Sequence, residues 1–156
     1  AEKKEDANKI LTRYKDSIEQ GISDMKQTSW ELVEATSAML SYANVLGTLH
    51  IRFGIGERND VETQYKELIQ FDQEKNFTTN KQYTFLYYAD FLASLEDYTG
   101  SLDVLRILTT EPLDRSLIEA LPKSKEFTSL SKIPHENIDN PAIAQIIEGI
   151  GSSYKQ

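Results

Sequence analysis

Apolar residues recur at steps of three and four along most of this chain, and this periodicity limits the fold more than any other feature. Over roughly residues 6–26 the recurring residues are Ile10, Leu11, Tyr14, Ile18, Ile22 and Met25. Such steps place side chains on one face of an α-helix, whereas a half-buried strand alternates at every second residue. Few alternating runs occur, so the sequence predicts an all-α fold.

Turn and capping signals divide the rest of the chain into further helices. Thr28 with Glu31, and Asn59 with Glu62, have the spacing of capping boxes. Asn140 followed by proline predicts a helix start. The predicted helices after the first lie at about 30–53, 60–73, 81–95, 100–110, 113–121, 125–133 and 141–150.

The length of 156 residues favours one helical domain that spans the whole chain. Within it, residues 1–28 form an N-terminal helix and residues 113–156 form irregular C-terminal helices. Residues 30–112 form two helical hairpins, which invite a test for an internal repeat.

The two predicted hairpins share a pattern of large and small residues. In the second hairpin the pattern consists of Phe85, Tyr88, Ala89, Leu92, Leu95, Asp97, Tyr98, Ser101, Leu102, Leu105, Leu108 and Pro112. In the first it consists of Ala43, Leu46, Gly47, His50, Phe53, Gly54, Val61, Tyr65 and Leu68. Over residues 42–112 the chain resembles the tetratricopeptide repeat family, with a long period of about 41 residues.

This resemblance implies helical hairpins that stack as a short right-handed superhelix, with capping helices at both ends. Its small residues, Gly47 and Ala89, would let the paired helices approach closely. The alternative is an unrelated helical bundle, because any antiparallel helix pair has similar spacing.

Composition bears on the kinds of partner and chemistry. The net charge is −8 and cysteine is absent. Nucleic acid and anionic membrane surfaces are therefore not expected as partners, and no transmembrane helix is predicted. The two histidines, His50 and His135, are too few for a metal cluster. No catalytic motif is found, so we expect no enzyme activity, cofactor or metal.

The resemblance also implies which side chains would line a concave groove. One predicted helix would contribute Asn44, Thr48 and Ile51, and a later one Tyr83, Tyr87 and Asp90. Tyrosine is common where proteins bind one another. We therefore expect these six residues to bind a protein or peptide.

The function expected from these observations is a non-enzymatic interaction module, a scaffold or adaptor that binds a peptide or a partner helix. One alternative is a peptide-sensing regulatory domain of a larger protein, and another is a small helical enzyme. The apolar stripe of residues 141–150 is expected to cap the stack, or else to form a homodimer.

Overall fold

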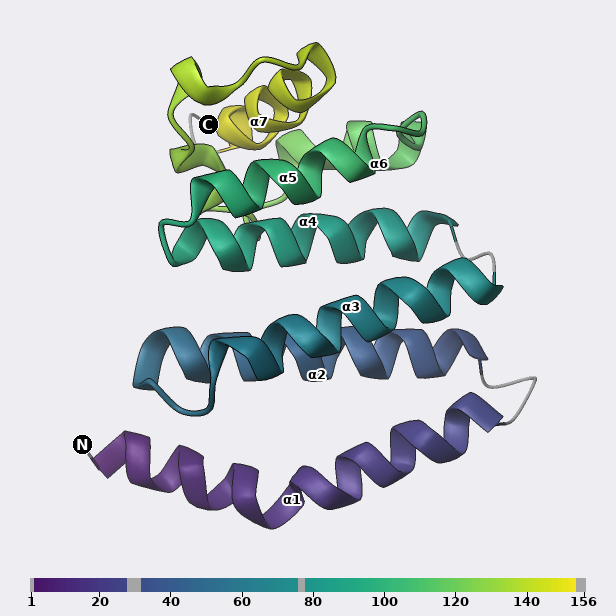
Figure 1. The fold of residues 1–156 in the computed structure, drawn as a ribbon, viewed down its shortest axis with the longest axis vertical. Helices are drawn as coiled ribbons and strands as arrows, with labels where there is room; N and C mark the ends of the chain where they lie inside the picture. Colours follow the sequence, from purple (N-terminus) through teal and green to yellow (C-terminus); the bar gives the residue numbers. More distant parts are fainter. Residues whose placement is uncertain (1, 28–31, 76–77, 154–156) are drawn as a thin grey trace. The chain divides into compact units, whose positions relative to one another are not determined.

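A computed structural model describes residues 2–27, 32–75 and 78–153 of the chain. The described residues form seven α-helices and contain no strand, which confirms the all-α fold (Figure 1). The α-helices are α1 (Glu2–Gln27), α2 (Leu32–Phe53), α3 (Arg58–Lys75), α4 (Thr78–Ser94), α5 (Tyr98–Leu108), α6 (Arg115–Ala120) and α7 (Pro141–Ser153). Three short 3₁₀ turns are η2 (Leu121–Lys123), η3 (Leu130–Lys132) and η4 (His135–Asn137).

The chain divides into two compact units, Ala1–Lys75 and Asn76–Gln156. We call them unit 1 and unit 2 and describe each by itself. Unit 1 contains α1 to α3, and unit 2 contains α4 to α7. A single domain over residues 1–156, and the stacking of its hairpins, remain predictions.

Unit 1 is built on the hairpin of α2 and α3, with α1 packed against α2 (Figure 1). One cluster of its core consists of Ala35, Met39, Leu68 and Phe71, with Ile22, Met25 and Leu40 packed against it. The apolar stripe of α1 therefore reaches this cluster near its C-terminal end. Further toward the N-terminus the same stripe is exposed, and Ile10 has 61% of its surface accessible.

The turn between α2 and α3 contains two glycines with positive φ, Gly54 at 65° and Gly56 at 74°. This region of backbone space strongly favours glycine. Nδ1 of His50 lies 3.0 Å from the carbonyl oxygen of Gly56, so the histidine holds the turn.

The predicted capping box of Asn59 is wrong, because α3 already begins at Arg58. Asp60 donates its backbone N–H to the carbonyl oxygen of Glu57, so the first turn forms one residue before Asn59. Glu62 instead pairs with Arg58 at 3.1 Å, one turn earlier on the same helix. The other predicted box, of Thr28 and Glu31, lies outside the described residues.

Unit 2 begins with the closely packed hairpin of α4 and α5. Ser101 is fully buried, and its hydroxyl donates to the carbonyl oxygen of Ala89 at 2.7 Å. Two small residues thus allow the helices to approach, as expected for Ala89. Asp97 caps α5 by accepting the N–H of Gly100 at 2.9 Å, and a Cβ at Gly100 would lie only 2.6 Å from that carboxylate.

The final helix, α7, starts as predicted. Oδ1 of Asn140 accepts the backbone N–H of Ala142 at 2.8 Å, and Pro141 occupies the first helical position. The apolar stripe of α7 is buried within unit 2, in Ile143, Ile146, Ile147 and Ile150. These four side chains pack inside the unit, and both the capping role and the homodimer stay predictions.

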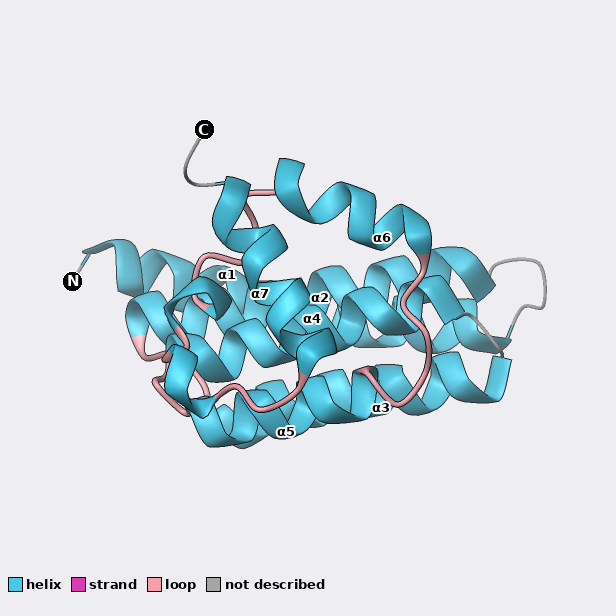
Figure 2. Ribbon diagram, turned by 90° about the horizontal axis from the view of Figure 1, so that it is seen from above, coloured by secondary structure: helices cyan, strands magenta, loops and turns pink. Residues whose placement is uncertain are grey.

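The chain between α5 and α7 is less helical than predicted (Figure 2). The helix expected at 113–121 is only six residues long, and Pro122 lies within the following 3₁₀ turn. The helix expected at 125–133 is wrong, because only η3 forms there. Phe127, Leu130 and Ile133 are buried at a regular spacing of three, which 3₁₀ turns and bends satisfy without a continuous α-helix.

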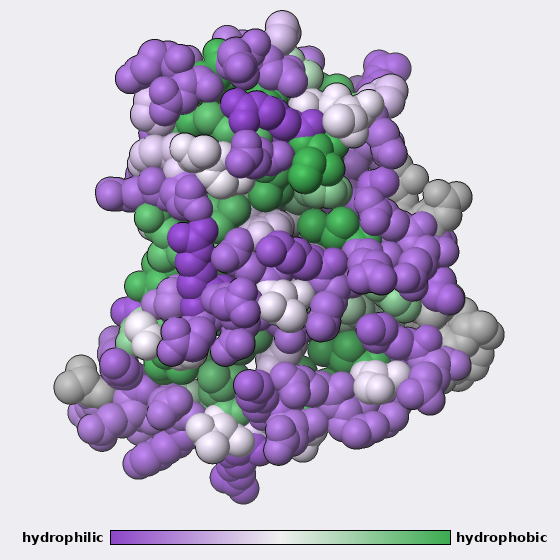
Figure 3. Space-filling model, viewed as in Figure 1, coloured by the Kyte–Doolittle hydropathy of each residue, from purple (hydrophilic) through white to green (hydrophobic). Residues whose placement is uncertain are grey.

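The visible surface of the molecule is mostly hydrophilic, and hydrophobic side chains show only in separate patches (Figure 3). This distribution is ordinary for a chain in which 27% of the residues are charged.

Candidate functional site

The six residues expected to line one groove divide between the two units. Asn44, Thr48 and Ile51 lie on α2 in unit 1, and Tyr83, Tyr87 and Asp90 lie on α4 in unit 2. We therefore describe each group of three within its own unit.

Tyr87 contacts the chain's own C-terminal segment. Its hydroxyl donates a hydrogen bond to the carboxylate of Glu126, and its ring centroid lies 4.9 Å from that of Phe127. Burial raises the pKa of Tyr87 above its usual value. The hydrogen bond to Glu126 and the charge of that residue raise it further. The phenol is therefore a neutral donor that holds this segment against α4.

Asp90 binds the backbone of the same segment. Its Oδ1 accepts the N–H of Leu130 at 3.1 Å. Burial raises the pKa of Asp90 to about 6, against the opposing effects of the N–H groups of Leu130 and Ser129 and the charge of Lys132. A raised carboxyl pKa can mark a catalytic site, but this carboxyl faces backbone amides that it anchors.

Gln82 is a third polar anchor on α4, and the sequence analysis did not identify it. Only 1% of its surface is exposed. Its amide nitrogen donates to the carbonyl oxygen of Pro112 at 3.1 Å, and its amide oxygen accepts the N–H of Asp114 at 3.0 Å. The helical spacing could have predicted its burial. Gln82 is four residues before the buried Leu86 and seven before the buried Ala89, so the three share one face of α4.

Tyr83 lines a recess of about 290 Å³ whose other walls come from residues 120–127, among them Lys123 and Phe127. The chain's own residues thus cover the α4 face on which Tyr83, Tyr87 and Asp90 lie. In unit 2 this face recognises an irregular chain segment through side-chain and backbone hydrogen bonds.

The three α2 residues are more open. Asn44 is half-buried and accepts a hydrogen bond from the hydroxyl of Tyr65 at 2.6 Å. Thr48 is exposed, and its hydroxyl donates to the carbonyl oxygen of Asn44 at 2.9 Å. Ile51 is exposed as well. These residues form a polar helix face with an exposed apolar end.

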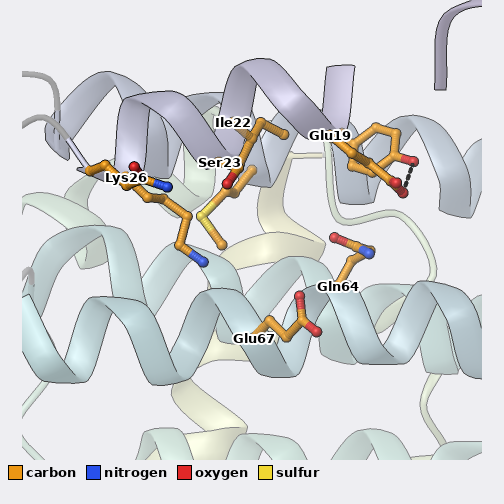
Figure 4. A pocket seen from close by; sticks show the side chains of 9 residues that line it. Glu19, Ile22, Ser23, Lys26, Gln64 and Glu67 are labelled. Carbon is orange, nitrogen blue, oxygen red and sulfur yellow. Dashed lines mark hydrogen bonds between the residues drawn. The ribbon is translucent and has the colours of Figure 1, made fainter. Parts of the chain in front are cut away.

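Unit 1 contains a cavity of about 540 Å³ between α1, α2 and α3. It is lined by Glu19, Ile22, Ser23, Lys26, Gln27, Met39, Tyr42, Gln64 and Glu67. In Figure 4, Lys26 from α1 and Gln64 and Glu67 from α3 project into the space between the two helices. The sequence did not predict this cavity, because its α3 residues Gln64 and Glu67 lie outside the apolar stripe of Val61, Tyr65 and Leu68.

The cavity has an apolar base and a charged rim. Met39 is buried and Ile22 is half-buried. Glu19 accepts a hydrogen bond from the hydroxyl of Tyr42 at 2.9 Å (Figure 4). Burial, together with this hydrogen bond and the charge of Glu19, raises the pKa of Tyr42 above its usual value, so the phenol stays a donor.

A second hollow, of about 330 Å³, continues from the first. It is lined by Lys26, Glu67, Gln70, Phe71, Glu74 and Lys75, and it shares Lys26 and Glu67 with the cavity. We call these two neighbouring hollows together the α1–α3 groove. Its α3 side, residues 64–75, is about 16 Å long at the helical rise of 1.5 Å per residue.

Among residues 2–27, 32–75 and 78–153 there is no group of three or more acidic or histidine side chains that could hold a metal ion. Within the same residues, no helix has both the length and the apolar character to cross a membrane. Comparisons with protein-family models, curated proteins and solved structures find no match to this chain.

Proposed function

We propose that this protein is a non-enzymatic interaction module, and that its α1–α3 groove binds a peptide or a partner helix. The observation that carries the proposal is the groove itself, which combines an apolar base with polar side chains on opposite walls. Sites that recognise chain segments have this composition, since apolar contact supplies affinity and a few polar groups supply orientation.

The size of the groove fits a short segment. A length of about 16 Å accommodates about three turns of a partner helix or about five residues of extended chain. The α1 and α3 walls are regular helices, so the groove is preformed and little ordering is required of it on binding.

Unit 2 supports the proposal because one of its helix faces already binds an irregular segment of the chain. There a helix face holds an irregular stretch of chain through Gln82, Tyr87 and Asp90, with Phe127 buried beside them. The resemblance of the hairpins to tetratricopeptide repeats supports the same class of function, and remains part of the proposal.

Selection from a random peptide library displayed on phage tests this function. Ser23 lies on the α1 wall, so Ser23→Trp fills part of the groove. We expect the selected peptides to bind the unmodified protein and to lose about tenfold in affinity for this variant.

The matched control is Ser17→Trp, which adds the same side chain on an exposed part of α1 that does not line the groove. It should bind the selected peptides as the unmodified protein does. Failure to enrich any peptide, or equal binding to both tryptophan variants, would contradict the proposal.

A further inference from the structure

We propose that the α1–α3 groove selects a partner segment that carries a basic side chain, arginine or lysine, and that this side chain lies between Glu19 and Glu67. The inference rests on the proposed function and adds the chemistry of the partner. It follows from where the carboxylates, the apolar base and the single lining cation of the cavity lie.

The two carboxylates come from opposite walls. Glu19 belongs to α1 and Glu67 to α3, and both line the same cavity. Glu67 is exposed and projects toward α1 (Figure 4). A cation in this space meets carboxylates from two sides, whereas an anion there is repelled from both.

The hydrogen bond of Glu19 leaves it able to bind a cation. The hydroxyl of Tyr42 donates to Oε1, at 2.9 Å. A carboxylate has two oxygens and about four lone-pair sites, so one donor does not saturate it. The bond also orients the carboxylate and thereby reduces the entropy lost when a ligand binds.

Among the described residues that line the cavity, Lys26 is the one cation, and it also lines the second hollow. Nζ of Lys26 is 5.1 Å from the ring centroid of Phe71, a residue of the second hollow. This contact draws the ammonium group toward the region where the two hollows meet. Lys26 and Glu67 line both hollows, whereas Glu19 and Gln64 line the cavity alone, so the Glu19 end of the groove lies away from Lys26.

The remaining lining groups suit a long basic side chain. Ile22 and Met39 offer apolar contact to its methylene groups. Methionine is flexible and adapts to different shapes. Ser23 and Gln64 add oxygen acceptors at the rim, which match the several N–H donors of a guanidinium group.

The charge of the whole chain favours the same partner. A net charge of −8 attracts basic segments over a distance and increases their rate of encounter with the groove. Local carboxylates then provide the discrimination between basic and neutral side chains.

Methionine methyl NMR provides the test, because the chain has only two methionines. Met39 lines the cavity, whereas Met25 is not among its lining residues and packs against the core cluster that contains Met39. The probes are the blocked pentapeptide Ala-Leu-Arg-Leu-Ala and the same peptide with neutral citrulline in place of arginine. A Met25→Leu variant assigns the two signals.

We expect the arginine peptide to shift the Met39 signal more than the Met25 signal and to bind about fivefold more tightly than the citrulline peptide. The double variant Glu19→Gln, Glu67→Gln should abolish this preference. The control, Glu2→Gln with Glu5→Gln, changes the net charge equally at exposed positions outside the groove and should retain it.

Equal binding of the two peptides at Met39 would overturn the inference and leave the proposed function standing. A preference that the double variant retains would also overturn it, since the selectivity would then arise elsewhere. Absence of any Met39 response would overturn it too, while the phage selection decides separately whether the groove binds other segments.

Discussion

Gln82 shows how a single buried amide can organise unit 2. Its side chain forms two hydrogen bonds to the backbone of the loop after α5. It donates to the carbonyl oxygen of Pro112 and accepts the N–H of Asp114. Both backbone groups lie beyond α5, which has already ended at Leu108. The side chain therefore acts as a substitute for backbone pairing in an irregular stretch.

Replacement of Gln82 by alanine should lower the free energy of unfolding of unit 2 by about 1–3 kcal/mol, because it removes two part-buried hydrogen bonds to the backbone. Urea unfolding followed by circular dichroism measures the change. Gln70→Ala is the matched control, since Gln70 is exposed and bonds only to Glu74 on its own helix. An equal loss in the two variants would argue against the anchoring role.

Asp90 should make the stability of unit 2 depend on pH. Its folded pKa of about 6 lies above the ordinary value of 3.8, so between these values the folded state binds more protons than the unfolded state. The free energy of unfolding therefore gains from this group as pH falls below about 6, and the gain is lost as pH rises through 6. Its full size is on the order of 3 kcal/mol.

Urea unfolding at pH 4.5 and pH 7.5 tests this dependence. Asp90→Asn removes this titrating group. When the pH is lowered from 7.5 to 4.5, the free energy of unfolding of the unmodified protein should therefore increase relative to that of the variant. Glu136→Gln removes a carboxylate at an exposed position and should leave the dependence unchanged. The same pH dependence in all three proteins would refute the assignment.

Among the elements, α7 is the one whose start is best explained by local sequence. Asn140 accepts two backbone N–H groups, from Ala142 at 2.8 Å and Ile143 at 3.4 Å, and proline follows it directly. The helix then buries its whole apolar stripe in unit 2. Cap and burial act together, because the cap orients the stripe toward the core.

We expect Asn140→Ala to destabilise unit 2 by about 1 kcal/mol and Asn140→Asp to retain most of the cap. Thermal unfolding of the two variants separates these outcomes. Asn137→Ala, at an exposed residue of η4, should change the melting temperature little. A loss in the aspartate variant as large as in the alanine variant would contradict a capping role.

The segment between α6 and α7 shows where local pattern misleads. Residues 125–133 have apolar residues spaced for a helix, yet only η3 forms. Asp90 and Tyr87 hold this segment from α4, and Phe127, Leu130 and Ile133 are buried without a continuous helix. Contacts with distant residues therefore overrode a weak local preference.

At the scale of the whole molecule, the division into two units has a testable consequence. Each unit has its own helix pairs and its own buried residues. We expect the fragments 1–75 and 76–156 to be helical and to unfold cooperatively when each is produced alone. The sum of their circular dichroism spectra should match that of the full chain.

The full chain is the reference for this experiment. A fragment that is unstructured by itself would show that its stability depends on the other unit. That result would favour the single domain expected from the sequence.

The α1–α3 groove could not be predicted from the sequence, for a physical reason. Glu19 and Glu67 are exposed and Lys26 and Gln64 half-buried on two helices, and polar residues at such positions usually only solvate a surface. Their arrangement around Met39 depends on how α1 packs against α2. The expected residues Tyr87 and Asp90 were correctly placed on one face of α4, but their use as internal anchors was not predicted.

The sequence by itself determined the helical class, the order of the main helices and the start of α7, because periodicity and capping depend on residues within a few positions of one another. Only the tertiary structure decided which polar side chains are buried anchors and where a groove opens. The bonds from Gln82 to Asp114 and from Asp90 to Leu130 join residues 32 and 40 positions apart. Local pattern carries no information on such pairs, since they form only when packing brings distant segments together.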